Sequence, residues 1–172
     1  MKNIILIGMP GAGKSTIGVV LAKVAGAVFV DTDLLIQQQE GSLLQAIVDK
    51  IGCDNFITLE SNFLAGFIPQ GFSVIATGGS AVYTKIAMDN LSSIGKIVYL
   101  QLPYSEIEKR IHNITTRGLA MAKGKTLLDL YNERLPLYQK YADITIDCQN
   151  KTIENIALEI LNEFKKELNV SL

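Results

Sequence analysis

The sequence predicts an α/β fold of three layers, in which a five-stranded parallel sheet is covered by helices on both faces. The first observation is a set of five short apolar runs, rich in β-branched residues, which is typical of buried strands. The second is that segments with helical periodicity separate these runs, and several begin with a Ser or Thr that can cap the helix. This alternation favours parallel strands with ligands bound at their carboxyl ends.

The predicted elements follow one another along the whole chain. Strands are predicted at residues 4–7, 27–30, 73–76, 97–100 and 143–146. Helices are predicted at residues 16–25, 42–50, 53–67, 84–91, 105–112, 126–141 and 152–168. The segment 113–125 differs, because it combines two Thr, two Gly, an Arg and two Lys with little apolar periodicity, and we expect a mobile flap there.

Length and composition predict one domain, residues 1–172, because a chain with 48% apolar residues can bury a sizeable core. The formal net charge of −1 disfavours a nucleic-acid partner, which needs a broad basic surface. No run approaches the roughly 18 apolar residues of a membrane span, and the start leaves no room for a signal peptide. We therefore expect a cytoplasmic protein without a membrane partner, and a monomer. Cys53 and Cys148 lack metal-binding spacing and are interpreted as reduced packing residues.

A phosphate-binding loop follows the first predicted strand. Residues 8–15 read GMPGAGKS, which matches G-x-x-x-x-G-K-[ST] between a strand and a helix. The glycines let backbone N–H groups turn toward phosphate oxygens, and the next helix points the positive end of its dipole at the same charge. Lys14 is expected to contact the β- and γ-phosphates, Ser15 to ligate Mg²⁺, and Thr16 to add a phosphate contact. The predicted nucleoside triphosphate site consists of Gly11, Ala12, Gly13, Lys14, Ser15 and Thr16.

Two further polar stretches follow the second and third predicted strands. Asp31-Thr32-Asp33 places two carboxylates near the loop, where one can serve Mg²⁺ and its waters and the other a substrate hydroxyl. The alternative is that both are turn or capping residues, with Asp33 capping the helix that follows. The stretch 77–80, TGGS, offers bare backbone that a small ligand can approach closely, or it forms a simple turn.

The order of these motifs resembles that of the shikimate kinase family. The resemblance rests on GMPGAGKS at 8–15, DTD at 31–33, TGGS at 77–80, one arginine in the flap, and ERLPLY at 133–138. It covers nearly the whole chain, from residue 1 to about residue 147. It implies a P-loop kinase fold of the nucleoside-monophosphate-kinase type, with substrate-binding helices at about 33–67 and a closing lid at about 112–125. The implied reaction uses ATP and Mg²⁺ and converts shikimate, a small-molecule substrate, to shikimate 3-phosphate.

The resemblance assigns the acceptor site to four residues. Asp33 is implied to hydrogen-bond the acceptor hydroxyls and to take the proton as a hydroxyl attacks the γ-phosphoryl group. Arg134 is implied to bind the substrate carboxylate, because a planar guanidinium offers paired donors to it. Gly78 and Gly79 are implied to contact the ring of the substrate.

The resemblance also assigns residues around the donor. Asp31 is implied to be an outer-sphere partner of Mg²⁺, beside Ser15. Arg117 is implied to be the lid arginine that closes over the γ-phosphate, where it adds positive charge as negative charge spreads in the transition state. Arg110 is implied to lie beside the adenine. With Lys14 and Asp33, Arg117 completes the implied set of catalytic residues.

The acceptor side departs from the family pattern at two positions. The family usually has Phe-Arg-x-x-Glu in the substrate-binding helix, whereas residues 56–60 here read FITLE, so that Ile57 replaces an arginine. Losing one of two charged donors to a carboxylate costs on the order of 1.5–3 kcal/mol, or roughly ten- to a hundredfold in affinity. Glu60 remains and is expected to pair with Arg134 alone. Ser80 replaces the usual third glycine, where its side chain narrows the pocket or offers a hydroxyl.

Three functions therefore stay open at the level of sequence. The first is phosphorylation of shikimate, and the second is phosphorylation of a different polyol or sugar acid by a related kinase. The third is a regulatory module that binds ATP, has lost its acceptor, and recognises a partner through an apolar surface near Ile57 and Phe67. Retention of Asp33, Arg117 and Arg134 argues against the third, because a binding module does not need all of them.

Overall fold

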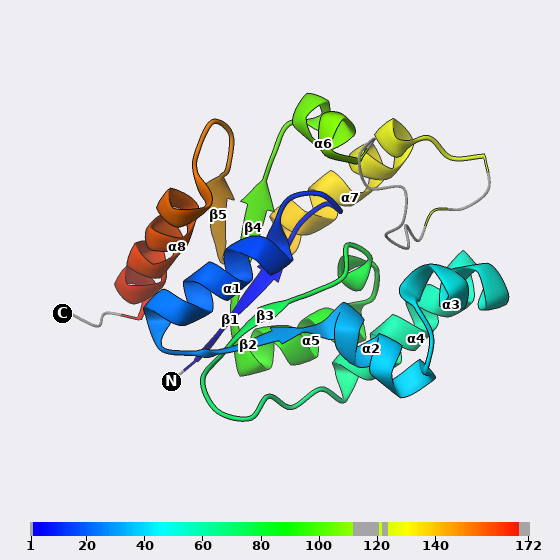
Figure 1. Cartoon of the computed structure of the whole chain (residues 1–172), viewed down its shortest axis with the longest axis horizontal. Helices are drawn as coiled ribbons and strands as arrows, with labels where there is room; N and C mark the ends of the chain where they lie inside the picture. Colours follow the sequence, from blue (N-terminus) through cyan, green and yellow to red (C-terminus); the bar gives the residue numbers. More distant parts are fainter. Residues whose placement is uncertain (1, 112–120, 122–123, 169–172) are drawn as a thin grey trace.

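The computed structural model describes residues 2–111, 121 and 124–168, and its centre is a five-stranded sheet. All neighbouring strands pair in parallel, in the order β2-β3-β1-β4-β5, as Figure 1 shows. The strands are β1 (Asn3–Ile7), β2 (Val28–Asp31), β3 (Ser73–Ala76), β4 (Gly95–Gln101) and β5 (Ile144–Asp147). Each predicted strand is present, and the parallel three-layer fold predicted from the sequence is confirmed.

Helices cover both faces of the sheet. Those of the described residues are α1 (Lys14–Ala25), α2 (Thr32–Glu40), α3 (Leu44–Ile51), α4 (Cys53–Ala65), α5 (Lys85–Ile94), α6 (Tyr104–Ile111), α7 (Leu127–Tyr141) and α8 (Ile153–Glu167), with a short 3₁₀ helix η1 (Ala81–Tyr83). On one face α1 packs against α8, and on the other α4 packs against α5. In Figure 1, α2 and α3 lie beyond the carboxyl end of β2. No helix within the described residues is long and apolar enough to cross a membrane.

The helix α2 was missing from the elements predicted by periodicity. Its sequence is TDLLIQQQE, and its buried residues are Thr32 and Ile36. Its three apolar residues are consecutive and only one of them is buried, so the helix has no apolar periodicity to detect. What begins the helix is a cap: the Asp31 carboxylate accepts hydrogen bonds from the backbone N–H groups of Asp33 and Leu34, at 3.0 and 3.4 Å. The capping residue is therefore Asp31, and the alternative that Asp33 caps this helix is wrong.

Two apolar clusters hold the structure together. The main cluster contains the fully buried strands β1 and β3 and the buried residues of β4, with the inner faces of α1, α5, α7 and α8. A smaller one joins α2, α3 and α4 through Ile36, Ile47, Val48 and Phe56, with Ile57 packed against it. The helices expected to bind substrate thus share a core of their own beside the sheet. The predicted lid at 112–125 falls mostly on residues 112–120 and 122–123, which lie outside the described residues.

At Gly95, β4 approaches β1 too closely for a side chain. The Cα of Gly95 pairs with that of Asn3, and a Cβ at Gly95 would stand 2.5 Å from the Asn3 carbonyl oxygen. We expect Gly95→Ala to lower the free energy of unfolding by about 1–3 kcal/mol in urea denaturation, because the strand must shift to fit the methyl group. Gly66→Ala is the matched control: its Cβ would meet the Asn62 oxygen at an ordinary 3.8 Å. Equal losses in the two variants would contradict this account of the strand contact.

Candidate active site

The loop between β1 and α1 has the backbone that a phosphate site requires. Gly8 and Gly13 have φ angles of 146° and 93°, which residues other than glycine rarely adopt. A Cβ on Gly8 would also stand 2.9 Å from the backbone oxygen of Leu100 in β4. Gly13 is followed at once by Lys14, the first residue of α1, so the helix begins two residues earlier than predicted and its N-terminus meets the loop.

Lys14 lies beneath this loop with its side chain almost fully buried, at 8% exposure. Its ammonium group donates to the carbonyl oxygens of Gly8 and Met9, at 2.7 and 3.0 Å. Burial lowers the pKa of Lys14 to about 8, although the Asp33 carboxylate opposes that shift. The structure therefore holds a cation at the loop, oriented by the backbone of the loop itself.

Ser15 and Asp31 provide adjacent oxygens at the end of β2. The Ser15 hydroxyl donates to the Asp31 carboxylate at 2.6 Å, while the other oxygen of Asp31 caps α2. A serine hydroxyl and a carboxylate are oxygen donors of the kind that Mg²⁺ prefers. These two predicted metal residues therefore fit a magnesium site by chemistry and by position, and Asp31 has a structural role as well.

Gly78 is the meeting point of two carboxylates. A Cβ on Gly78 would stand 2.1 Å from Glu60 Oε1 and 2.7 Å from Asp33 Oδ1, so these two oxygens leave no room for a side chain at residue 78. Gly79, the next residue, faces the cation: its Cβ would stand 2.8 Å from Arg134 Nη1 and 2.8 Å from the Pro10 ring. We call residues 77–80, TGGS, the glycine wall. The carboxylates of Glu60 and Asp33 lie against Gly78, and the guanidinium of Arg134 lies against Gly79.

Glu60 projects into this wall from α4 and is only 1% exposed. The Ser80 hydroxyl donates a hydrogen bond to Glu60 Oε2, whereas Oε1 is buried and has no hydrogen-bond partner among the described residues. Burial, and after it the charge of Asp33, raise the pKa of Glu60 to about 7, and the Ser80 hydrogen bond works against that increase. The carboxylate thus ionises close to neutral pH.

Arg134 reaches the same wall from α7 and is also 1% exposed. Its Nε donates to the Tyr83 hydroxyl at 3.0 Å, and its guanidinium carbon lies 5.0 Å from the centre of the Tyr83 ring. Although burial opposes the shift, Tyr138, Tyr83 and Glu60 raise the pKa of Arg134, so the guanidinium stays charged. Tyr138, one turn after Arg134, donates to the Gly79 carbonyl oxygen at 2.6 Å and ties α7 to the glycine wall.

Tyr83 and Ser80 are site residues that sequence reasoning did not assign. Ser80 was noted as a departure, but its partner Glu60 lies twenty residues earlier on another element, and no spacing rule connects them. Tyr83 lies on the short helix η1, which has no sequence pattern of its own. The sequence signal for Tyr83 is the motif ERLPLY, because an arginine that is buried on a helix requires a partner from elsewhere in the chain.

Ile57 lies on the same side of α4 as Glu60, because residues three apart on a helix share a face. It is half-buried and packs on the smaller apolar cluster. One turn earlier on α4, burial and the charge of Asp54 raise the pKa of the Cys53 thiol, while the charge of Arg134 opposes the increase. An apolar side chain therefore shares the face of α4 that carries Glu60.

The remaining predicted residues lie at the rim or outside the description. Arg110, on α6, is exposed and its Nη1 lies 3.4 Å from the Gly11 carbonyl oxygen, which places it at the edge of the phosphate loop. Thr16 is exposed on the first turn of α1. Arg117 lies outside the described residues. The structure thus brings together the loop, Asp31, Asp33, Gly78, Gly79 and Arg134, with Arg110 beside them.

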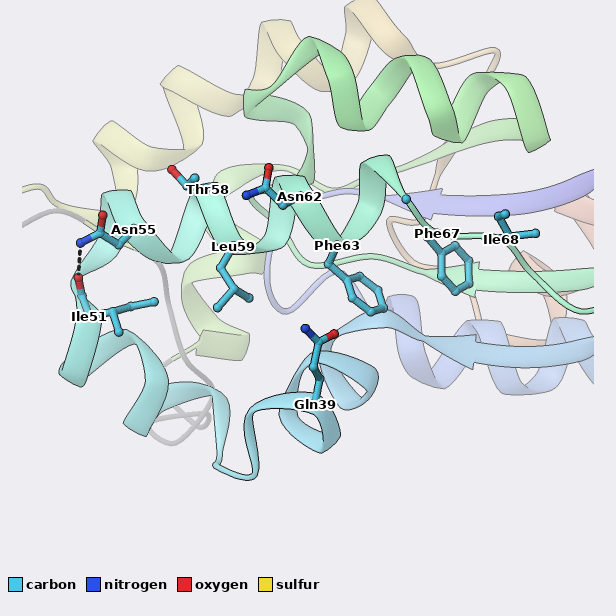
Figure 2. Close-up of a pocket in the computed structure, with 10 residues that line it drawn as sticks. Gln39, Ile51, Asn55, Thr58, Leu59, Asn62, Phe63, Phe67 and Ile68 are labelled. Atoms are coloured by element: carbon cyan, nitrogen blue, oxygen red, sulfur yellow. Dashed lines mark hydrogen bonds between the residues drawn. The ribbon is translucent and has the colours of Figure 1, made fainter.

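A separate groove of about 820 Å³ runs along the outer face of α4. Figure 2 shows Leu59, Phe63 and Phe67 lining it, with Gln39 of α2 opposite. Ile57 is not one of its lining residues. The apolar surface that the regulatory alternative requires is therefore made by the phenylalanines and is distinct from the face that carries Ile57 and Glu60.

Comparisons with known proteins show similarity to shikimate kinases in sequence and in structure. The family model for shikimate kinase matches residues 10–165 of this chain. A shikimate kinase of Thermodesulfovibrio yellowstonii is 34% identical over 171 residues, which is 98% of each chain. A solved shikimate kinase of Acinetobacter baumannii in complex with shikimate has a TM-score of 0.87 at 32% identity, covering 98% of this chain and 94% of that one. That of Aquifex aeolicus has a TM-score of 0.81 at 30% identity, covering 96% and 98%.

The burial of Glu60 predicts a specific pH dependence of stability. Its pKa is about 7 in the fold and 4.5 ordinarily, so between these pH values the folded state holds a proton that the unfolded state has lost. The free energy of unfolding therefore falls as pH rises through this window. Glu60→Gln does not titrate, and we expect it to gain about 2–3 kcal/mol relative to the native protein between pH 4.5 and pH 8.

Urea denaturation of both proteins across this pH range measures the difference. Glu154→Gln, at an exposed position on α8, is the control and should follow the native protein. A constant difference between the native protein and the Glu60 variant at all pH values would show that Glu60 ionises normally in the fold.

Proposed function

The chain belongs to the shikimate kinase family, and we propose that it transfers the γ-phosphoryl group of ATP to a hydroxyl of shikimate, giving shikimate 3-phosphate. The observation that carries the proposal is the glycine wall beside the phosphate loop, which has carboxylates at Gly78 and a buried guanidinium at Gly79. A small acid with hydroxyl groups offers the complementary chemistry, because its carboxylate suits the arginine and its hydroxyls suit the carboxylates.

The family uses ATP, and the donor half of the site suits it. The loop at 8–15 and the N-terminus of α1 accept the phosphates, and Lys14 exchanges its carbonyl partners at Gly8 and Met9 for phosphate oxygens. We assign Ser15 and Asp31 to Mg²⁺, which supplies positive charge that neutralises the phosphates. Arg110 at the loop edge is assigned to the adenine side, and Thr16 to a further phosphate contact.

On the acceptor side, we assign the role of the base to Asp33. It follows β2, lies beside Gly78, and faces the charge of Lys14 across the site. Asp33 accepts the hydroxyl proton as the hydroxyl oxygen attacks the γ-phosphorus, and the ADP oxygen leaves on the opposite side. Arg134 holds the carboxylate and thereby fixes which hydroxyl faces the phosphate. Arg117 is assigned, by the family resemblance, to the charge that closes over the γ-phosphate.

A kinase that acts on a different polyol or sugar acid is the second candidate, and Ile57 is the observation that favours it. Ile57 is an apolar residue on the face of α4 that carries Glu60, at a position where the family resemblance leads us to expect a second arginine. An acceptor with a less strongly bound anionic group, or with an apolar group near residue 57, suits an isoleucine at this position. The regulatory module is disfavoured, since burying Glu60 and Arg134 is costly and brings nothing to a protein that only binds ATP.

The decisive experiment measures ADP release with ATP and Mg²⁺ in the presence of single acceptors. We expect shikimate to raise the rate at least tenfold over the rate with water as acceptor, and gluconate, quinate and glycerol to give smaller increases. An increase with one of the other acceptors alone would favour the second candidate. No acceptor-dependent turnover in the whole panel, together with tight ATP binding, would sink the kinase proposal.

Ile57→Arg tests whether the missing donor limits the affinity for shikimate. We expect the KM for shikimate to fall about tenfold or more, because a charged hydrogen bond to a carboxylate contributes roughly 1.5–3 kcal/mol. Thr58→Arg is the matched control, since it adds the same charge on the next residue of α4, which is exposed and faces the outer groove. An unchanged KM in the Ile57 variant would show that the site has diverged beyond this one contact.

A further inference from the structure

Ser80 is the residue of the glycine wall whose side chain enters the site. It is only 5% exposed, and its hydroxyl donates to Oε2 of the equally buried Glu60. A glycine at this position would leave that oxygen without its donor inside the protein. The hydrogen bond joins the loop after β3 to α4, so it restrains a side chain that enters the wall from another element.

The orientation of Glu60 matters because of where its charge lies. Oε1 faces Gly78 next to Asp33, and Arg134 passes beside Gly79, one residue further along the same loop. Within the described part of the chain, the charged groups that act on Glu60 are Asp33 from α2, Lys14 from α1 and Arg134 from α7. Asp33 repels it, and Lys14 is hydrogen-bonded to the carbonyls of Gly8 and Met9. A Glu60 carboxylate released from Ser80 is therefore drawn toward Arg134.

We propose that Ser80 is a positioning residue of the acceptor site, whose hydroxyl restrains Glu60 so that this carboxylate does not compete with the acceptor carboxylate for Arg134. The inference rests on the proposed function, because it takes Arg134 to bind the carboxylate of shikimate. It assigns a role to the serine at a position where the family resemblance leads us to expect glycine.

The test compares Ser80→Ala with Ser61→Ala. Ser61 follows Glu60 on α4 and is buried, and its hydroxyl lies 2.7 Å from that of Thr84, so its loss also removes a buried serine hydroxyl. At pH 8, where Glu60 is mostly ionised, we expect Ser80→Ala to raise the KM for shikimate about fivefold, with kcat and the KM for ATP within about twofold. Ser61→Ala should leave all three values near those of the native protein. An unchanged KM for shikimate in Ser80→Ala would overturn the proposal.

A double-mutant cycle shows whether Ser80 acts through Glu60. Glutamine at position 60 carries no charge to compete for Arg134, so Ser80→Ala should change the KM for shikimate less than about twofold in the Glu60→Gln background. The same fivefold effect in both backgrounds would contradict a role through Glu60.

A crystal structure of Ser80→Ala without acceptor separates this inference from the proposed function. We expect the Glu60 carboxylate to turn from residue 80 toward Arg134, whatever the acceptor of the native enzyme proves to be. A carboxylate that keeps its position in this variant would overturn the inference even if the native protein phosphorylates shikimate. Failure of shikimate turnover in the native protein, with the turned carboxylate observed, would instead overturn the proposed function alone.

Discussion

Burial of opposite charges around two glycines is the constraint on which the rest of this site depends. Lys14, Glu60 and Arg134 are nearly inaccessible, and taking such groups out of water is costly unless each has hydrogen-bond partners. Backbone carbonyls of the phosphate loop serve Lys14, Ser80 serves Glu60, and Tyr83 serves Arg134. These partners come from separate elements, so the site exists only when β1, β3, α4 and α7 are packed together.

This constraint also explains why the wall consists of glycines. Gly78 and Gly79 stand where a Cβ would collide with Glu60, Asp33 and Arg134. A side chain at either position would therefore displace these charged groups. The charged groups approach this closely because residues 78 and 79 have no side chains. The lack of a side chain at Gly79 also places the guanidinium of Arg134 beside Pro10 of the phosphate loop.

The sequence predicted the parts of this arrangement that are local. The apolar runs predicted the parallel sheet, and GMPGAGKS predicted a phosphate loop whose Ser15 meets Asp31. Periodicity did not predict α2, because that helix begins with an Asp31 cap and has few buried positions. Nor did it predict that Tyr83 would hold Arg134 or that Ser80 would hold Glu60. Those contacts join residues 51 and 20 positions apart, and only the packing of the helices on the sheet brings them together.

The central claim is that the buried guanidinium of Arg134 recognises the carboxylate of the acceptor. Titration calorimetry of shikimate and of shikimate methyl ester, each in the presence of ADP and Mg²⁺, measures that recognition most directly, because the ester keeps every hydroxyl and loses only the charge. The account predicts that the ester binds at least about tenfold more weakly, as expected for loss of a charge-assisted hydrogen bond. Equal affinities for the acid and the ester would contradict it.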